Sequence, residues 1–257
     1  MKIKILRQAM PDSQPYWQEF YYEWKENQTV AGMLEELNYK DDLTDISGHP
    51  ARRIQWECSC LQGMCGACAM VINNRPALAC ETFLRDLGDA AVTLEPLRKF
   101  PTVCDLVVDR GIMQENLKKA NAYIGEYRET LIKSILPPLG DVFSRGRIDG
   151  CAFNQRIPRE ADPKEYEHMY AAGKCLKCGL CLEVCPNYDG GQIFYGAAFA
   201  NDCYLIAFRS KSMNNAVRDS YNAHFAKGCS KALSCVDVCP MKIPTLASIA
   251  KMNRGKN

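Results

Sequence analysis

The hydrophobic pattern differs between the two halves of the chain, and the first half begins with an alternation. Ile3 and Ile5 alternate with lysines, and a turn-rich stretch at residues 11–15 leads into the aromatic run YWQEFYYEW. A period of two, followed by turn residues and a second β-prone run, is typical of two paired strands. We therefore predict a β-hairpin at the N-terminus.

One helix and three further strands complete the expected first unit. Thr29 precedes apolar residues at positions 30, 33, 34 and 37, which share one helix face, and its hydroxyl is suited to cap that helix. The stretch AMVINNRPALAC predicts two strands joined by Asn73-Asn74, a pair that tolerates positive φ, and AVTLEPL predicts a last strand. Strands around one helix, with a cysteine-rich loop between them, indicate a β-grasp domain, which we place at residues 1–105.

Beyond FPTVCDLVVDR the pattern becomes helical. The segment QENLKKANAYIGEYRETLIKS places Leu117, Ala120, Tyr123 and Ile124 on one face of a helix. Three later segments, PKEYEHMYAAGK, GAAFANDCYLIAFRSKS and IPTLASIAKMN, predict further helices. The predicted fold class is α+β, with the β-grasp domain followed by an all-α domain over residues 106–257.

Composition narrows the classes of function. With 47% hydrophobic and 24% charged residues the chain can fill a core, and its net charge of +2 is too small for a typical nucleic-acid binder. It contains no apolar run of about 18 residues, so we expect no membrane span. Its start, MKIKILRQAM, lacks the apolar segment of a secretory signal.

The cysteines change the picture most, because the chain has 15 of them. Disulfide frameworks belong mainly to small secreted chains, and this chain is not small and does not begin with the pattern of a secretory signal. Buried structural cysteines would be scattered along the sequence, whereas most of these gather in three groups with the spacing of metal ligands. We therefore predict that they bind metal.

The first group has the spacing Cys-x4-Cys-x2-Cys, followed by a fourth cysteine farther on, which is the plant-type ferredoxin pattern of a two-iron (2Fe-2S) cluster. Gly63 and Gly66 permit the sharp turns that such a loop needs. Zinc is the alternative for four thiolates, but zinc ribbons usually pair two Cys-x2-Cys knuckles and only one is present. A Rieske centre would need two histidines, and the loop has none. Cys58 points to the same side as its neighbour at position 60 and is expected to be a bystander. The predicted ligands are Cys60, Cys65, Cys68 and Cys80.

The second group, CLKCGLCLEVCP, has the spacing of a two-cluster ferredoxin, in which three cysteines hold one four-iron cluster and the fourth serves another. That pattern requires a second Cys-Pro run, and GCSKALSCVDVCP supplies it. Reciprocal exchange then assigns Cys175, Cys178, Cys181 and Cys239 to a four-iron (4Fe-4S) cluster. It assigns Cys185, Cys229 and Cys235 to its neighbour.

The last run departs from the ferredoxin pattern at one position, where Ala232 replaces the expected cysteine. A methyl group cannot bind iron, so we predict a three-iron (3Fe-4S) cluster at this centre. A four-iron cluster with one iron open to water or substrate is the alternative. The preferred ligand count implies nine irons per chain, and folding of the second half should be coupled to cluster assembly.

The remaining cysteines and the histidines lie outside these spacings. Structural roles are expected for Cys104, Cys151 and Cys203. We expect His49, His168 and His224 to be hydrogen-bonded or exposed.

In the order and spacing of its three motifs the chain resembles the iron–sulfur subunit of succinate dehydrogenase and fumarate reductase. The segments NNRPALACETFLRDL and LVVDR also resemble that family, after the two-iron loop and at the domain junction. The resemblance covers essentially the whole chain.

What the resemblance implies is an electron relay within an oxidoreductase complex. Electrons would pass between the FAD of a flavoprotein subunit, which holds the succinate or fumarate site, and a quinone near a membrane-anchor subunit, with or without haem. The chain would lie on the cytoplasmic face of a prokaryotic membrane, with its β-grasp half toward the flavoprotein. Independently, the chain has no G-x-G-x-x-G fingerprint and no P-loop, so the carbon chemistry is expected elsewhere.

Two departures from the ubiquinone-type members favour menaquinone and fumarate reduction. A tryptophan pair is replaced by Pro186-Asn187-Tyr188-Asp189, and a histidine by Ser230. Two other hypotheses stay open at this point: a similar subunit of a thiol-linked reductase, and a zinc-bound structural module.

Overall fold

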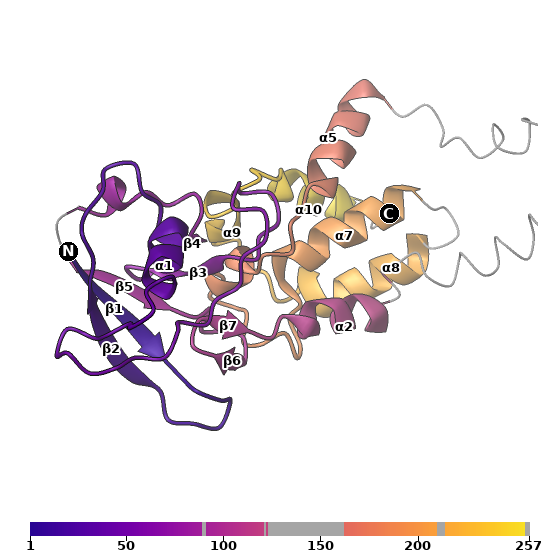
Figure 1. Ribbon diagram of the computed structural model, residues 1–257. Helices are drawn as coiled ribbons and strands as arrows, with labels where there is room; N and C mark the ends of the chain where they lie inside the picture. Colours follow the sequence, from indigo (N-terminus) through magenta and orange to yellow (C-terminus); the bar gives the residue numbers. More distant parts are fainter. Residues whose placement is uncertain (89–90, 121, 123–161, 210–213, 255–257) are drawn as a thin grey trace, which may run out of the picture.

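The computed structural model describes residues 1–88, 91–120, 122, 162–209 and 214–254. Figure 1 shows a strand-rich N-terminal domain beside a helical C-terminal domain, with α5 extending outward. The strands are β1 (Lys2–Arg7), β2 (Tyr16–Tyr21), β3 (Ala69–Ile72), β4 (Arg75–Leu78), β5 (Val92–Glu95), β6 (Thr102–Cys104) and β7 (Val107–Val108). The helices are α1 (Val30–Asn38), η1 (Leu84–Leu87), α2 (Gly111–Lys119), α5 (Pro163–Gly173), α6 (Leu180–Glu183), α7 (Gly196–Arg209), α8 (Asn214–Tyr221), η2 (Asn222–Ala226), α9 (Ser234–Asp237) and α10 (Thr245–Arg254).

The N-terminal sheet has the order β2-β1-β5-β3-β4. β1 pairs antiparallel with β2 and parallel with β5, and β3 pairs antiparallel with both β4 and β5. The alternation in β1 buries Ile3 and Ile5 completely, and the apolar face of α1 joins the same core. This mixed sheet with one helix confirms the predicted β-grasp fold.

Local sequence signals account for two of its features. The Thr29 hydroxyl accepts a hydrogen bond from the Gly32 amide at 3.1 Å, so it caps α1 as predicted. Asn73 and Asn74 have φ of +46° and +62°, which turns β3 directly into β4. The predicted hairpin at this position is confirmed.

A buried ion pair fixes the segment that leads into the cysteine loop. Arg7 and Asp105 are completely buried and lie 3.1 Å apart, and Arg7 also donates to the carbonyls of residues 52 and 53. Asp105 in turn accepts from the Gln55 amide at 3.0 Å. Because both charges are paired and hydrogen-bonded, their burial is tolerated, and the chain before Cys58 is held against the sheet.

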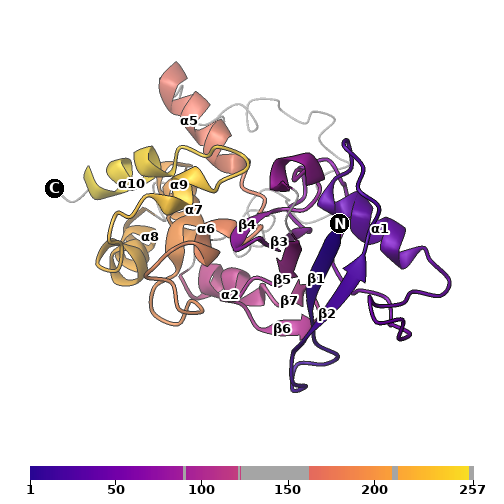
Figure 2. The ribbon, with the colours of Figure 1, turned by 90° about the vertical axis from the view of Figure 1, so that its left-hand side faces the viewer.

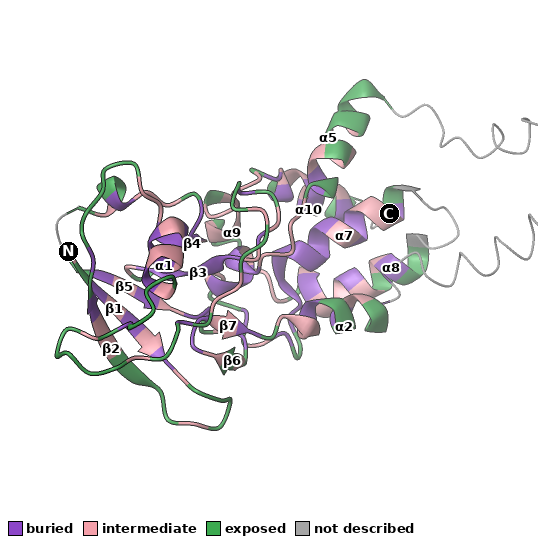
Figure 3. Ribbon diagram, viewed as in Figure 1, coloured by how far each residue is buried: buried purple, intermediate pink, exposed green. Residues whose placement is uncertain are grey.

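The helical domain is organised around α7, which packs against α5, α6, α8 and α10. Its buried face contains small residues together with Cys203 and Tyr204 (Figure 3). The three later predicted helices correspond to α5, α7 and α10. The first corresponds in part to α2, on which Leu117 packs against the core. This helix ends at Lys119, so Ala120 is its C-cap and not part of the helix as predicted; Tyr123 and Ile124 lie outside the described residues.

The domains meet through their loops and short helices. Figure 2 shows β4 beside α6, and these two elements are in contact. The short pair β6–β7, which the hydrophobic pattern did not indicate, lies at the junction, on both sides of the predicted boundary at residue 105. Among the helices of the described ranges, none has the length and apolar character needed to cross a bilayer.

Candidate metal centres

The first cysteine loop directs its backbone amides at its thiols. The Cys60 sulfur accepts from the amides of Gln62 at 3.4 Å and Met64 at 3.2 Å, and the Cys80 sulfur accepts from that of Gly63 at 3.3 Å. The sulfurs of Cys68 and Cys80 are 3.3 Å apart. Gly63 and Gly66 have φ of +69° and +75°, as the predicted tight loop requires.

The thiols of this loop differ in their surroundings. Hydrogen bonds from the amides of Gln62 and Met64 lower the pKa of Cys60 to about 7. Burial raises the pKa of Cys68 to about 12, although a backbone hydrogen bond of Cys80 acts to lower it while the Cys80 thiol acts to raise it. An iron cluster, being a cation toward its ligands, would draw both thiols into the thiolate form.

Cys58 is exposed at the start of this loop. Burial of its sulfur raises its pKa, with further contributions from the negative charges of Glu35 and Cys65. Its thiol is therefore within electrostatic reach of the predicted ligand Cys65. That Cys58 itself is a bystander stays a prediction.

The thiols predicted to hold the four-iron cluster line one cavity. Cys175 and Cys178 come from the segment before α6, Cys181 lies in α6 itself, and Cys239 comes from the distant segment after α9. Cys235, predicted for the neighbouring centre, also lines its wall. The structure thus brings the two remote cysteine runs together.

The electrostatic neighbours of these thiols follow the same grouping. The pKa of Cys178 is raised to about 11, mainly by burial and in addition by the negative charges of Cys175 and Cys239. Burial also raises the pKa of Cys181, whose charged neighbours include Cys239 and Cys235. Four thiols gathered in one cavity, where negative charges would repel one another, are suited to a cationic metal cluster.

A second cavity contains the other predicted set, Cys185, Cys229 and Cys235, together with Ala232. Burial raises the pKa of Cys235, followed by the negative charges of Cys185 and Cys229. The fourth cysteine of the opening run therefore faces the thiols of the last run. Cys239, the last cysteine of the other run, lines the first cavity instead.

The two cysteine runs have the same backbone path. Lys177 and Lys231, each two residues after the first cysteine, have φ of +55° and +60°. Gly179 and Leu233, each four residues after it, have φ of +88° and +62° and precede the four-residue helices α6 and α9. The repeat places Ala232 in the position that Cys178 occupies in the first run.

Arg110 joins the first loop to the second, although its sequence position gave no sign of this role. Its guanidinium donates to the carbonyls of Gly66 and Ala67, both at 3.1 Å, and of Cys178 at 3.2 Å, and it pairs with Glu57. These hydrogen bonds join the loops of the first two centres.

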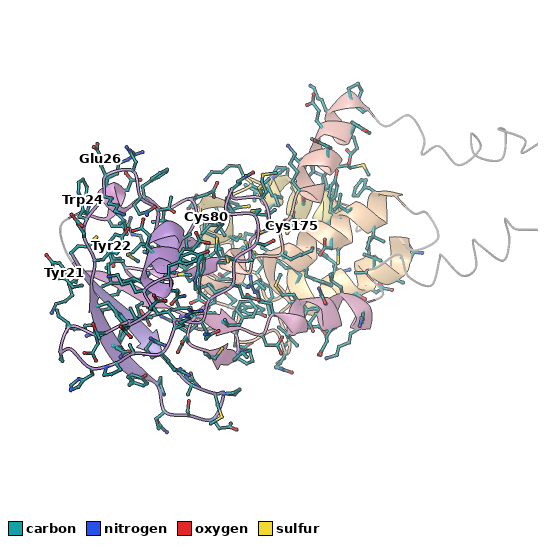
Figure 4. All side chains as sticks on the ribbon, in the orientation of Figure 1. Tyr21, Tyr22, Trp24, Glu26, Cys80 and Cys175 are labelled. Carbon is teal, nitrogen blue, oxygen red and sulfur yellow. The ribbon has the colours of Figure 1, made fainter. Side chains whose placement is uncertain are left out.

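In Figure 4 the labelled Cys80 and Cys175 lie toward the middle of the molecule, and the aromatic residues labelled at its N-terminal end lie far from them.

The donor set fits iron–sulfur clusters. Each predicted ligand is a thiol, and Asn201 lines the first cavity with an Oδ1 atom that has no hydrogen-bond partner, while its Nδ2 donates to Thr245 Oγ1 at 2.9 Å. Rotating this amide by 180° turns the Nδ2 donor toward the cavity, where cluster sulfides accept, and lets Oδ1 accept from the Thr245 hydroxyl. Within the described ranges, no three Cys, His, Asp or Glu side chains converge as ligands of a single metal ion.

The remaining candidates are accounted for by packing. Cys203 is buried in α7 and Cys104 is half-buried in β6; Cys151 lies outside the described residues. His168 Nε2 is 2.9 Å from the Ser248 hydroxyl, and His224 stacks on Tyr195. The side chain of His49 is exposed.

The chain matches two families of cluster-binding domain. Residues 2–115 match the "2Fe-2S iron-sulfur cluster binding domain", and residues 174–244 match the "4Fe-4S dicluster domain". The first match contains the loop with Cys60, Cys65, Cys68 and Cys80, and the second contains both of the later cysteine runs.

Curated relatives match almost end to end. The chain is 33% identical to the succinate dehydrogenase iron-sulfur subunit of Bacillus subtilis, over 100% of this chain and 92% of the relative. It is 26% identical to the fumarate reductase iron-sulfur subunit of Wolinella succinogenes, over 94% of this chain and 90% of the relative. The solved Sdh1 complex of Mycobacterium smegmatis contains a chain of similar fold, with a TM-score of 0.67, 21% identity, and coverage of 99% and 94%. The chain therefore belongs to the family of succinate dehydrogenase and fumarate reductase iron–sulfur subunits.

Proposed function

We propose that this chain relays electrons between a flavin in a partner subunit and a quinone, through a two-iron, a four-iron and a three-iron cluster in that order. The observation that carries the proposal is the crossed arrangement of the cysteine runs. Cys239 lines the cavity of Cys175, Cys178 and Cys181, and Cys185 lines that of the last run. Arg110, which donates to the carbonyl of Gly66 in the first loop and to that of Cys178, supports a continuous path.

The ligands of each cluster follow from this arrangement. The two-iron cluster is assigned to Cys60, Cys65 and Cys68, from the loop before β3, and to Cys80, which follows β4. The four-iron cluster is assigned to Cys175, Cys178, Cys181 and Cys239, and the three-iron cluster to Cys185, Cys229 and Cys235. The repeat supports a three-iron cluster, because Ala232 occupies the position of a ligand in the other run. The domain boundary is proposed at residue 105, between the strand-rich part of the chain and the helices that begin with α2.

The quinone is proposed to bind beside the third centre. The second cavity has a volume of about 250 Å³, against about 30 Å³ for the first, and extends to the apolar side chains of Leu233, Leu246 and Ile249. Leu233 and Leu246 are 43% and 51% exposed, so this opening is apolar at the surface. A membrane-anchor subunit covering it would place the chain on the cytoplasmic face of a prokaryotic membrane.

Menaquinone and fumarate reduction are the favoured pair. Pro186 and Ser230 line the second cavity, and the Ser230 hydroxyl donates to Asn187 Oδ1 at 2.6 Å. The two places where the chain departs from ubiquinone-type relatives thus touch each other at the same cavity. The flavoprotein, with its FAD and dicarboxylate site, is proposed to bind on the side of the two-iron loop.

Substitution of Ala232 by cysteine tests the third centre. We expect Ala232→Cys to bind a fourth iron, so that the EPR signal of an oxidised three-iron cluster disappears from the purified complex. Ser230→Cys, which adds a thiol to the same cavity out of register with the repeat, is the matched control and should keep the signal. A fully loaded Ala232→Cys complex that retains the three-iron signal would refute the assignment.

A further inference from the structure

A partly buried ion pair lies at the wall of the four-iron cavity. Lys177 lies between Cys175 and Cys178 and lines that cavity. Its ammonium pairs with Asp202 of α7, whose side chain is 14% exposed, and the carboxylate has no other ion-pair partner among the described residues. Neither residue belongs to the predicted ligand set, and sequence spacing does not connect them.

The two charges lie beside the predicted ligands and have opposite signs: Lys177 lines the cavity of Cys175 and Cys178, and Asp202 pairs with it. A cation near a cluster in this cavity favours the state with one more electron, and a nearby anion opposes that state. Partial burial keeps solvent from screening either charge fully.

We propose that the Lys177–Asp202 ion pair sets the reduction potential of the four-iron centre, with Asp202 cancelling the field of a lysine that the cluster loop holds at the cavity wall. This inference rests on the proposed ligand assignment. The pair keeps the cluster's surroundings close to neutral, so the four-iron potential stays lower than Lys177 alone would make it.

The internal repeat supplies a comparison within the same chain. Lys231 has the position and backbone conformation of Lys177 in the second run and lines the second cavity. It is exposed, and no acidic side chain of the described residues lies within ion-pair distance of it. The two centres therefore have a lysine at the same position of their loops, but only the lysine of the four-iron centre is paired with a carboxylate. This difference lowers the reduction potential of the four-iron centre relative to that of the second centre.

The test is a redox titration of the purified complex, followed by EPR at each cluster. Asp202→Asn keeps the size and hydrogen-bonding capacity of the side chain but removes its charge, and we expect the four-iron midpoint potential to rise. The double variant Lys177→Gln/Asp202→Asn should return it toward the wild-type value. A purely structural role would shift the double variant at least as far as the single one.

Lys231→Gln is the matched control for removing a cation from the equivalent turn. It should lower the potential of the second centre and leave that of the four-iron centre unchanged. If the four-iron signal is present and its midpoint potential is the same in wild type and in Asp202→Asn, the proposed role of the ion pair is overturned. A wild-type complex without any four-iron signal overturns the ligand assignment itself.

Discussion

Gly66 is the residue at which the loops of the first and second centres touch most closely. It has a φ of +75°, and a Cβ atom built there would lie 2.7 Å from the Cβ of Cys178 and 3.1 Å from that of Leu176. Substitution by alanine therefore adds the cost of a left-handed backbone, about 1–2 kcal/mol, to an overpacking cost of about 1–3 kcal/mol. We expect Gly66→Ala to destabilise the protein by about 2–5 kcal/mol.

A second glycine separates the two contributions. Gly48 has a φ of +81° and no atom within 4 Å of its virtual Cβ, so Gly48→Ala carries the backbone cost alone. The difference between the variants then measures the clash of the loops. For a chain of this size about 1 kcal/mol shifts the melting temperature by about 2–4 °C, so Gly66→Ala should melt about 2–12 °C below Gly48→Ala.

The assay is thermal unfolding of cluster-loaded protein at one fixed scan rate, followed by circular dichroism, with iron content measured for each variant. Equal melting temperatures for Gly66→Ala and Gly48→Ala, at equal iron content, would refute the reasoning. The contact between the loops at Gly66 would then contribute nothing to stability.

Two further predictions concern the polar contacts between elements. Arg110→Met removes three hydrogen bonds from a charged donor to carbonyls of both cluster loops, and should lower the free energy of unfolding by about 2–5 kcal/mol; Arg110→Lys, which lacks the planar fork, should restore only part of it in the same melting assay. Burial acts to raise the pKa of Glu165, but the hydrogen bonds from Lys251 and Tyr204 overcome it and lower the pKa. The carboxylate therefore stabilises the protein above its unfolded pKa, and this stability is lost as the pH falls through the folded pKa. Glu165→Gln should cost about 1–3 kcal/mol at pH 7, and chemical denaturation should show no difference from wild type at a pH below the folded value; a pH-independent difference would contradict the assignment.

Local signals in the sequence were sufficient to predict most of the fold. The period of β1, the cap at Thr29 and the asparagine turn at residues 73–74 each act within a few residues, so they can be recognised without the structure. Cysteine spacing carries information at longer range, because a two-cluster ferredoxin run requires a partner run. That requirement predicts that Cys239 belongs with the opening motif, and the structure has these cysteines lining one cavity.

The contacts that join the elements were not predictable in this way. Arg110 reaches Gly66 and Cys178 across large sequence separations, and Lys177, in the loop before α6, reaches Asp202 on α7. Side chains of this kind have no fixed spacing from their partners, because the partner is set by tertiary packing. The pair β6–β7 escaped notice for a related reason, since strands of two or three residues are too short to show a period.

The crossing of the two cysteine runs has a consequence for biogenesis. On the proposed assignment, a ribosome that has released residues up to Cys80 presents every thiol of the two-iron centre. Neither later centre is complete until the last cysteine run has emerged, because Cys235 closes one of them and Cys239, just after it, closes the other. The sequence thus sets the order in which the centres acquire their full sets of thiols, and truncation before Cys235 would remove ligands of two centres while sparing the first.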